Sequence, residues 1–93
     1  MKPWLVYILR CGDDTLYTGI TTDVDRRIEE HNVGKAPGAR YTRSRRPVAL
    51  AYTEKVDSRA LAARREAEIK RLDRVSKLAL CESWQAASTG LSS

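Results

Sequence analysis

The chain has 93 residues, a length that fits one domain rather than several. Its longest apolar run, residues 4–9, is far below the roughly 20 residues that a membrane span requires, so no span is expected. Lys and Arg number 17 against 12 Asp and Glu, and the sequence pI is about 9.6. A pI above about 9 is typical of nucleic-acid binders, although many small soluble domains are also basic.

The two cysteines indicate the cellular compartment of the protein. Cys11 and Cys81 lie far apart, neither belongs to a C-x-x-C pair, and no secretory segment precedes the first apolar run. We therefore expect a cytoplasmic protein without disulfides, in which both thiols pack in the core.

In chain order, the first predicted elements are two strands. Residues 4–9 form a run of β-branched and aromatic side chains, residues 12–15 are a turn rich in Gly and Asp, and residues 16–20 form a second run. This succession predicts an antiparallel hairpin.

A helix and a loop are predicted next. Residues 21–23 offer a helix N-cap, and the helix is expected to end near Val33, because Gly34 suits the position that follows a helix. Residues 34–46 contain two glycines and a proline, which predicts a loop.

The remaining chain predicts one strand and two helices. Residues 47–56 alternate in part between apolar and polar side chains, which is typical of a third strand. One side of that strand is expected to carry Val48, Leu50 and Tyr52. A second helix is expected to run from a cap at Asp57 or Ser58 to about Asp73, and a third helix to cover about 76–84.

The predicted order of elements is ββαβαα. Three antiparallel strands flanked by helices make an α+β domain, which we place at residues 1–84. Residues 85–93 lack a periodic apolar face and are expected to form a flexible C-terminal tail.

The first helix brings two candidate site residues together. A helical wheel places Arg27 and His31 one turn apart beside the apolar pair Val24 and Ile28, whereas Arg26 points the opposite way. A cation at the margin of a core needs an acidic partner or an anionic ligand. The alternatives are a structural ion pair with a packed imidazole, or a site that binds an anion.

Other candidates lie on the second helix and the hairpin. The wheel places Glu66 and Glu68 on opposite margins of the apolar face and does not choose between them. Tyr7 and Tyr17 are expected on neighbouring strands with both phenols on one face, either as a site or as an aromatic core pair. A glycine inside a strand, Gly19, often marks the close approach of another backbone or a ligand.

The segment 39–46 is strongly basic. It carries four arginines and no acid, with a tyrosine, a threonine and a serine between them. Such a mixture predicts phosphate contacts and base stacking, unless it is simply a solvated loop. The predicted nucleic-acid contacts are Arg40, Tyr41, Arg43, Arg45 and Arg46, together with Lys70 on the second helix.

At this point the residues resemble a family. Val6-Tyr7-Ile8 and Tyr17-Thr18-Gly19 resemble the paired tripeptides that name the GIY-YIG nucleases, although Leu5-Val6 replaces Gly-Ile and Thr18 replaces Ile. Arg27 and His31 follow at the family's spacing, and Glu66 is similar to its metal-binding glutamate. The resemblance covers about residues 4–82 and is greatest to small single-domain bacterial members that lack a second DNA-binding domain.

The resemblance implies a mechanism. One Mg²⁺ or Mn²⁺ would be held by Glu66 as its sole protein ligand, and Arg27 would donate to the phosphate as charge develops. One tyrosine would act as general base, with Tyr7 preferred over Tyr17, once nearby cations lower its pKa, and His31 would accept or relay the proton. These five side chains are expected to converge on one cleft.

Two functions follow as expectations. The first is a metal-dependent endonuclease that hydrolyses phosphodiester bonds in branched, flapped or single-stranded DNA, in repair or recombination. The second is a nucleic-acid-binding module with vestigial catalysis or none. A purely structural domain is disfavoured by the basic segment. The expected partner is nucleic acid, DNA rather than RNA, and the chain is expected to be a monomer or a weak dimer.

Overall fold

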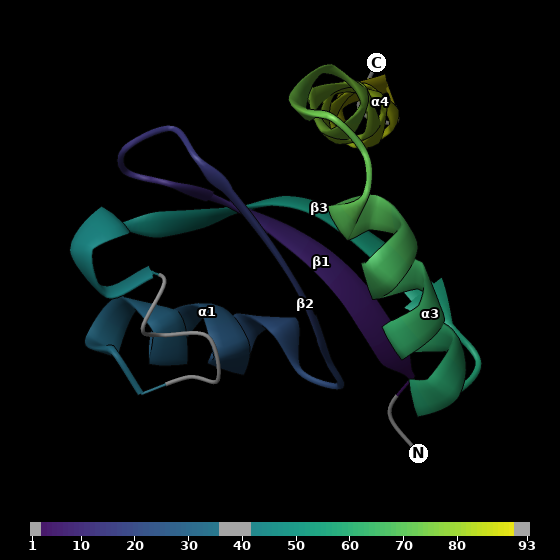
Figure 1. The fold of residues 1–93 in the computed structure, drawn as a ribbon, viewed down its shortest axis with the longest axis horizontal. Coiled ribbons are helices and arrows are strands. Elements are labelled where there is room, and N and C mark those ends of the chain that lie inside the picture. Colours follow the sequence, from purple (N-terminus) through teal and green to yellow (C-terminus); the bar gives the residue numbers. More distant parts are fainter. Residues whose placement is uncertain (1–2, 36–41, 91–93) are drawn as a thin grey trace.

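A computed structural model describes residues 3–35 and 42–90. The elements follow the predicted order ββαβαα, with a short 3-10 helix, η1, before the third strand (Figure 1). Their bounds are β1 Trp4–Cys11, β2 Leu16–Thr21, α1 Val24–Val33, η1 Arg43–Arg45, β3 Val48–Val56, α3 Arg59–Lys70 and α4 Arg74–Gly90. Within those two ranges, no helix combines the length and the apolar character needed to cross a membrane.

The strands form one antiparallel sheet in the order β2-β1-β3. Tyr7 lies at its centre, where its backbone pairs with Gly19 on one side and with Thr53 on the other. The hairpin turn is closed by Asp13, whose Oδ1 accepts bonds from Thr15 N at 3.2 Å and from Thr15 Oγ1 at 2.6 Å. This sheet confirms the predicted fold class.

Caps set the helix boundaries. Asp23 accepts from Arg26 N at 3.2 Å at the start of α1, and Gly34 ends that helix with a left-handed φ of 80°, as predicted. Ser58 caps α3 by accepting from Leu61 N at 3.1 Å.

The last two helices differ from the prediction. Asp73 was expected inside the second helix, but its Oδ1 accepts from Ser76 N at 2.8 Å, so it lies before α4 and α3 already ends at Lys70. Helix α4 then continues to Gly90. The predicted helix end at Trp84 is therefore wrong, and residues 85–90 are helical, although no apolar period marks them.

A β-bulge overturns the predicted face of the third strand. Along β1, Ile8 pairs with Tyr52 but the next residue, Leu9, pairs with Leu50, which leaves Ala51 as the extra residue. A bulge shifts the alternation of side chains by one position. Leu50 therefore packs with Leu9, whereas Tyr52 packs on the opposite face with Ile8, and the prediction for Tyr52 is wrong.

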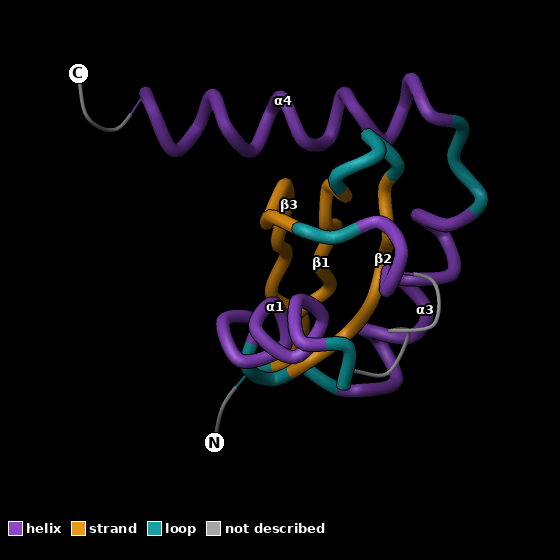
Figure 2. The backbone as a smooth tube through the Cα atoms, turned by 90° about the vertical axis from the view of Figure 1, so that its left-hand side faces the viewer, coloured by secondary structure: helices purple, strands orange, loops and turns teal. Residues whose placement is uncertain are grey.

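Alternation along β1 divides the core into two clusters. The first, which we call the apolar face, is covered by α3 and α4, and its buried residues are Val6, Ile8, Ala51, Ala62, Ile69 and Cys81. The second, which we call the α1 face, has as its buried members Tyr7, Leu9, Cys11 and Val48, with Tyr17, Val24, Ile28 and Leu50 packed against them. Helix α1 lies across this second face, while α3 runs beside β2 and α4 crosses the end of the sheet (Figure 2).

Candidate active site

Tyr7 occupies the centre of the α1 face because Gly19 makes room for its ring. A Cβ atom at position 19 would lie 2.5 Å from Tyr7 Oη and 2.6 Å from its Cζ, closer than carbon atoms approach. The close approach predicted for this strand glycine therefore exists, and the group that approaches is the phenol of Tyr7. Any larger residue at position 19 displaces that phenol.

Tyr17 lies diagonally across the hairpin from Tyr7. Its backbone pairs with Leu9, two residues along β1, so both phenols stand on the same face of the sheet. Their ring centroids are 6.4 Å apart. Tyr7 is only 1% exposed, whereas Tyr17 is half-buried. The predicted arrangement of two phenols on one face is confirmed.

His31 joins the two phenols from helix α1. Its imidazole is fully buried, its Nε2 lies 3.2 Å from Tyr7 Oη, and its ring centroid lies 5.1 Å from that of Tyr17. Its other nitrogen, Nδ1, lies 2.9 Å from Oγ1 of Thr42. His31 is therefore both a packed imidazole and a candidate site residue, so the two alternatives predicted for it are compatible.

Thr42 is the site residue that the sequence did not reveal. It was interpreted as one of the polar residues of the basic segment, available to phosphate, but it is fully buried and its hydroxyl faces His31. No periodicity or motif marks it. Thr42 lies between Tyr41 and Arg43, in a segment whose other residues were all interpreted as facing solvent or nucleic acid, so its position in the sequence did not indicate burial.

Burial determines the protonation of these groups. Burial raises the pKa of Tyr7 and, with the negative charge of Glu66, that of Tyr17, and in both cases it outweighs the lowering effect of Arg27. Burial first, and Arg27 second, lower the pKa of His31. At neutral pH both phenols are protonated and His31 is neutral. Arg27 therefore lowers the pKa of each phenol as expected, but not enough to bring it below its usual value.

Arg27 and Glu66 reach the same two phenols from different helices. The charge of Arg27 lowers the pKa of each phenol and that of Glu66 raises it, so both charged groups lie within electrostatic range of the tyrosine pair. Arg27 also pairs with Glu30 at 3.3 Å, and Glu66 pairs with Lys70 at 3.4 Å. The structure thus brings Tyr7, Tyr17 and His31 into contact and places Arg27 and Glu66, each in an ion pair, within electrostatic range of the phenols.

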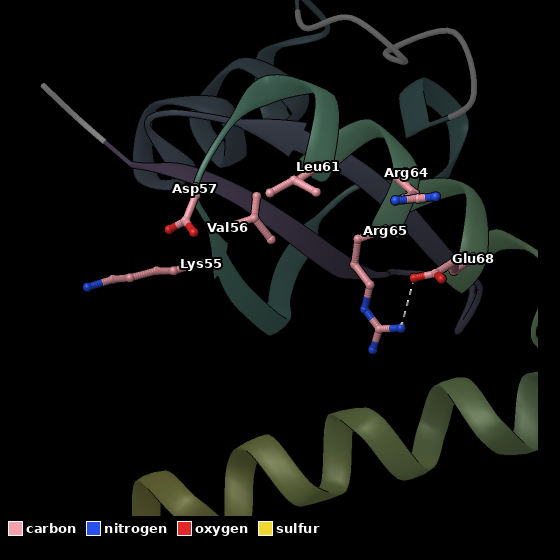
Figure 3. A pocket seen from close by; sticks show the side chains of 7 residues that line it. All are labelled: Lys55, Val56, Asp57, Leu61, Arg64, Arg65 and Glu68. Carbon is pink, nitrogen blue, oxygen red and sulfur yellow. Dashed lines mark hydrogen bonds and ion pairs between the residues drawn. The ribbon is translucent and has the colours of Figure 1, made fainter.

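The neighbouring charges that were expected to point away do so. The Arg26 side chain is 75% exposed against 23% for Arg27. The Glu68 side chain is 56% exposed against 23% for Glu66, and it bonds Arg65 at 3.5 Å on the other side of α3 (Figure 3). The structure thus resolves the choice that the helical wheel left open, in favour of Glu66.

The basic segment is only partly described. Arg40 and Tyr41 lie outside the described residues, and only the backbone of Arg43 is described. Arg45 lies 3.0 Å from Asp13 in the hairpin turn, and Arg46 donates to the carbonyl of Asn32 at 2.7 Å. These two arginines fasten the segment to the fold, a role that the sequence did not indicate.

The side chains around the site limit the kind of metal ion that it could bind. In residues 3–35 and 42–90, no group of three or more His, Cys, Asp or Glu side chains is arranged to hold one. Glu66 is the carboxylate whose charge acts on both phenols, whereas Glu30 acts on Tyr7 and pairs with Arg27, and carboxylate and phenol oxygens are hard donors of the kind that Mg²⁺ takes. A site with a single carboxylate fits an ion that retains most of its water.

Comparison with known proteins identifies the family of this chain. A family model described as the GIY-YIG catalytic domain matches residues 3–79. A UPF0213 protein of Desulfotalea psychrophila (strain LSv54 / DSM 12343) is 57% identical over 77 residues, which cover 83% of this chain and 69% of that protein. A UPF0213 protein of Staphylococcus haemolyticus (strain JCSC1435) is 53% identical over 82 residues, which cover 88% and 98%.

Solved structures share the fold. The solution NMR structure of the UPF0213 protein BH0048 from Bacillus halodurans has a TM-score of 0.53 at 49% identity and covers 85% of this chain and 82% of that one. That of the protein EF2693 from E. faecalis has a TM-score of 0.60 at 36% identity and covers 91% and 88%. The catalytic-domain model spans most of the chain, and the UPF0213 proteins of Desulfotalea psychrophila and Staphylococcus haemolyticus are more than half identical to it in sequence. The chain therefore belongs to the GIY-YIG nuclease family, among the small single-domain UPF0213 proteins.

Proposed function

We propose that this protein is a metal-dependent endonuclease that hydrolyses phosphodiester bonds in structured or single-stranded DNA. One observation carries the proposal. Two phenols on one face of the sheet lie against a buried imidazole, whose Nε2 is 3.2 Å from Tyr7 Oη, and the charges of Arg27 and Glu66 act on both phenols. A hydrolase of phosphodiesters needs a donor to the phosphate, a ligand for a metal and a proton acceptor, and these groups supply all three.

Glu66 would hold the metal. When bound, a divalent cation withdraws charge from the phosphate and favours ionisation of the attacking water. A cation held by Glu66 would also offset the negative charge of Glu66, which raises the pKa values of the two phenols. Arg27 donates to the non-bridging oxygens of the phosphate, where negative charge grows during attack.

The two tyrosines have different roles in this proposal. Tyr17 has the more exposed phenol and contacts the phosphate. Tyr7 transfers the proton, because its hydroxyl already bonds Nε2 of a neutral His31. As Tyr7 accepts the proton of the water, it passes its own proton to His31, so no free phenolate is required. Since Tyr7 is 1% exposed, the water has to enter beside it when the substrate binds.

A nucleic-acid-binding module without catalysis is the second candidate. It is favoured by the raised pKa values of Tyr7 and Tyr17, which leave both phenols protonated at neutral pH. The compartment that we propose for either function is the reducing cytoplasm, where the two buried free thiols, Cys11 and Cys81, are chemically stable.

A metal titration separates the two candidates. Branched, flapped and single-stranded DNA and single-stranded RNA are each incubated with the protein in increasing Mg²⁺ or Mn²⁺, with a chelator as control. The endonuclease predicts nicking of DNA that saturates with metal and stops in the chelator. If every substrate is bound but none is cut at any metal concentration, the binding module is the correct function.

A further inference from the structure

Charge is distributed unequally over the two helices that flank the site. Residues 55–77, which include α3 and the start of α4, contain eight Lys or Arg against four Asp or Glu. Residues 22–35, which include α1, contain three against four. The phosphate backbone is a line of negative charges, and its non-specific affinity comes from cations that neutralise it. Of these two segments, the one that includes α3 therefore carries the greater net positive charge and the stronger attraction for a strand.

Three cations on the solvent side of α3 can contact the phosphates of such a strand. Lys70 lies beside Glu66 and hence at the site, while Arg64 and Arg71 are exposed and form no ion pair with any described side chain. Arg64 also borders a groove of about 330 Å³ together with Lys55 (Figure 3). On α1, the exposed side carries Asp25 and Glu29 together with one cation, Arg26, which pairs with Glu30 at 3.4 Å.

We propose that the strand flanking the scissile phosphate leaves the site across α3, over Lys70, Arg71 and Arg64, which we call the α3 track. This inference rests on the proposed function for the position of the scissile phosphate. It adds a binding surface to the basic segment, in which Arg45 and Arg46 have partners within the protein.

Two double variants test the α3 track. Arg64→Ser with Arg71→Ser removes two charges from the track, and Arg26→Ser with Lys35→Ser removes two from the α1 side. Binding of labelled single-stranded DNA is measured in a chelator, so that no cleavage is needed, over a range of salt. The slope of log affinity against log salt should fall by about 0.7 for each phosphate that the track variant can no longer neutralise, and it should stay unchanged in the other variant.

Two outcomes would overturn the track. One is an unchanged slope in the Arg64/Arg71 variant, and the other is an equal decrease in both variants, which would show a general effect of net charge. Because the readout is binding without metal, a wild-type protein that binds DNA and never cuts it sinks the nuclease function and leaves the track standing.

A second inference comes from the buried chain of side chains Tyr7, His31 and Thr42. Tyr7 Oη lies 3.2 Å from Nε2 of His31, and Thr42 Oγ1 lies 2.9 Å from Nδ1, so either ring nitrogen of a neutral His31 has a partner for its proton. In the tautomer that the proposed proton transfer requires, the Tyr7 hydroxyl donates to Nε2 and the Nδ1 proton is donated to Oγ1 of Thr42. Which nitrogen of a histidine carries the proton is set by the hydrogen bond that the other nitrogen makes.

We infer that Thr42 is a positioning residue that keeps Nε2 of His31 free to accept the Tyr7 proton. Thr42 is fully buried, so no water replaces its oxygen. Without that oxygen the Nδ1 proton has no acceptor, and a buried unsatisfied donor costs about 1–3 kcal/mol. The imidazole then gains by moving the proton to Nε2, where it donates to Tyr7 Oη and blocks the transfer.

His31 is the only histidine in the chain, so its ring nitrogens can be read by NMR without assignment. The wild type should show a protonated Nδ1 and an unprotonated Nε2. Thr42→Val should shift the population toward a protonated Nε2, and Thr42→Ser should restore the wild-type pattern. In the cleavage assay the same Thr42→Val variant should lose kcat with little change in KM.

The tautomer decides this inference independently of any cleavage. A wild type with its proton on Nε2 would overturn it, and so would a Thr42→Val variant with an unchanged pattern. Should Thr42→Val not fold, the wild-type and Thr42→Ser spectra still provide the decision.

Discussion

The two faces of β1 are built from alternate residues of one strand and differ in almost everything else. The apolar face, with Val6 and Ile8, is closed by Ala62 and Ile69 of α3. The α1 face also has fully buried members, yet two of them, His31 and Thr42, are polar, and their polar atoms bond each other. Burial on the first face stabilises the fold, whereas burial on the second sets which groups carry protons.

The difference teaches how a small domain accommodates a site. Polar groups can be buried at little cost when each is hydrogen-bonded, as along the chain from Tyr7 through His31 to Thr42. The apolar face then supplies the stability that the α1 face lacks. Substitutions on the two faces should therefore affect different properties.

The largest effect is expected beside the α1 face. Arg27→Ala should lower the cleavage rate about 100- to 1000-fold, because it removes a donor that acts where charge develops. Arg26→Ala removes the same charge one residue earlier from an exposed position and should leave the rate nearly unchanged. Comparable decreases in the two variants would show that Arg27 has no special place in the site.

On the apolar face, Ile69→Ala should act on stability. Ile69 is fully buried, and loss of its side chain should lower the free energy of unfolding by about 2–5 kcal/mol in denaturant titrations. Val75→Ala, at a position 76% exposed, should change it by less than about 0.5 kcal/mol. The NMR signals of His31 should be unchanged in folded Ile69→Ala. If they shift, the two faces are not independent.

Gly19→Ala sharpens the comparison because it strains the α1 face alone. The new methyl would overlap the Tyr7 phenol, so we expect a decrease in stability of about 1–3 kcal/mol and a shift of the His31 ring signals. The atoms nearest to a Cβ at position 12 belong to Arg45 and Arg46, with the Arg46 carbonyl at 2.9 Å, so Gly12→Ala should destabilise the protein without displacing the Tyr7 phenol. A Gly19→Ala protein with wild-type His31 signals would contradict the placement of Tyr7.

The smallest effect is a pH dependence. Because burial lowers the pKa of His31 below its usual 6.5, the unfolded chain binds a proton at a pH where the folded chain does not. The contribution to the free energy of unfolding is complete above about pH 6.5 and is lost as the pH falls toward the folded pKa. His31→Gln should remove the pH dependence of the free energy of unfolding in this pH range. Stability that rises on acidification through it would have the wrong sign.

The sequence predicted the order of elements because strong local signals define them. The hairpin turn, the cap at Asp23 and the glycine after α1 all act within a few residues, and each lies where it was expected. The paired tyrosine motifs and the helical spacing of Arg27 and His31 likewise predicted the core of the site.

What the sequence did not predict depends on contacts between distant segments. Tyr52 changes face because of a bulge in the pairing of β3 with β1, which the alternation of β3 alone does not reveal. Arg65 lies near the buried side of α3 because its Nε donates a hydrogen bond to Glu54 of β3 at 3.1 Å. Thr42 likewise acquires its role only when its segment folds back over α1.

The central claim is that Glu66, beside the phenols of Tyr7 and Tyr17, holds the metal that cleavage requires. Glu66→Gln removes the charge and keeps the shape, and Glu68→Gln makes the same change two residues away on the far side of α3. Nicking of structured DNA in Mg²⁺ is measured for both, with binding measured in a chelator.

Glu66→Gln should abolish nicking while DNA binding stays equal or becomes tighter, because a carboxylate without metal repels the phosphate. Glu68→Gln should nick at the parent rate. A Glu66→Gln protein that nicks DNA as fast as the parent in Mg²⁺ would contradict the account.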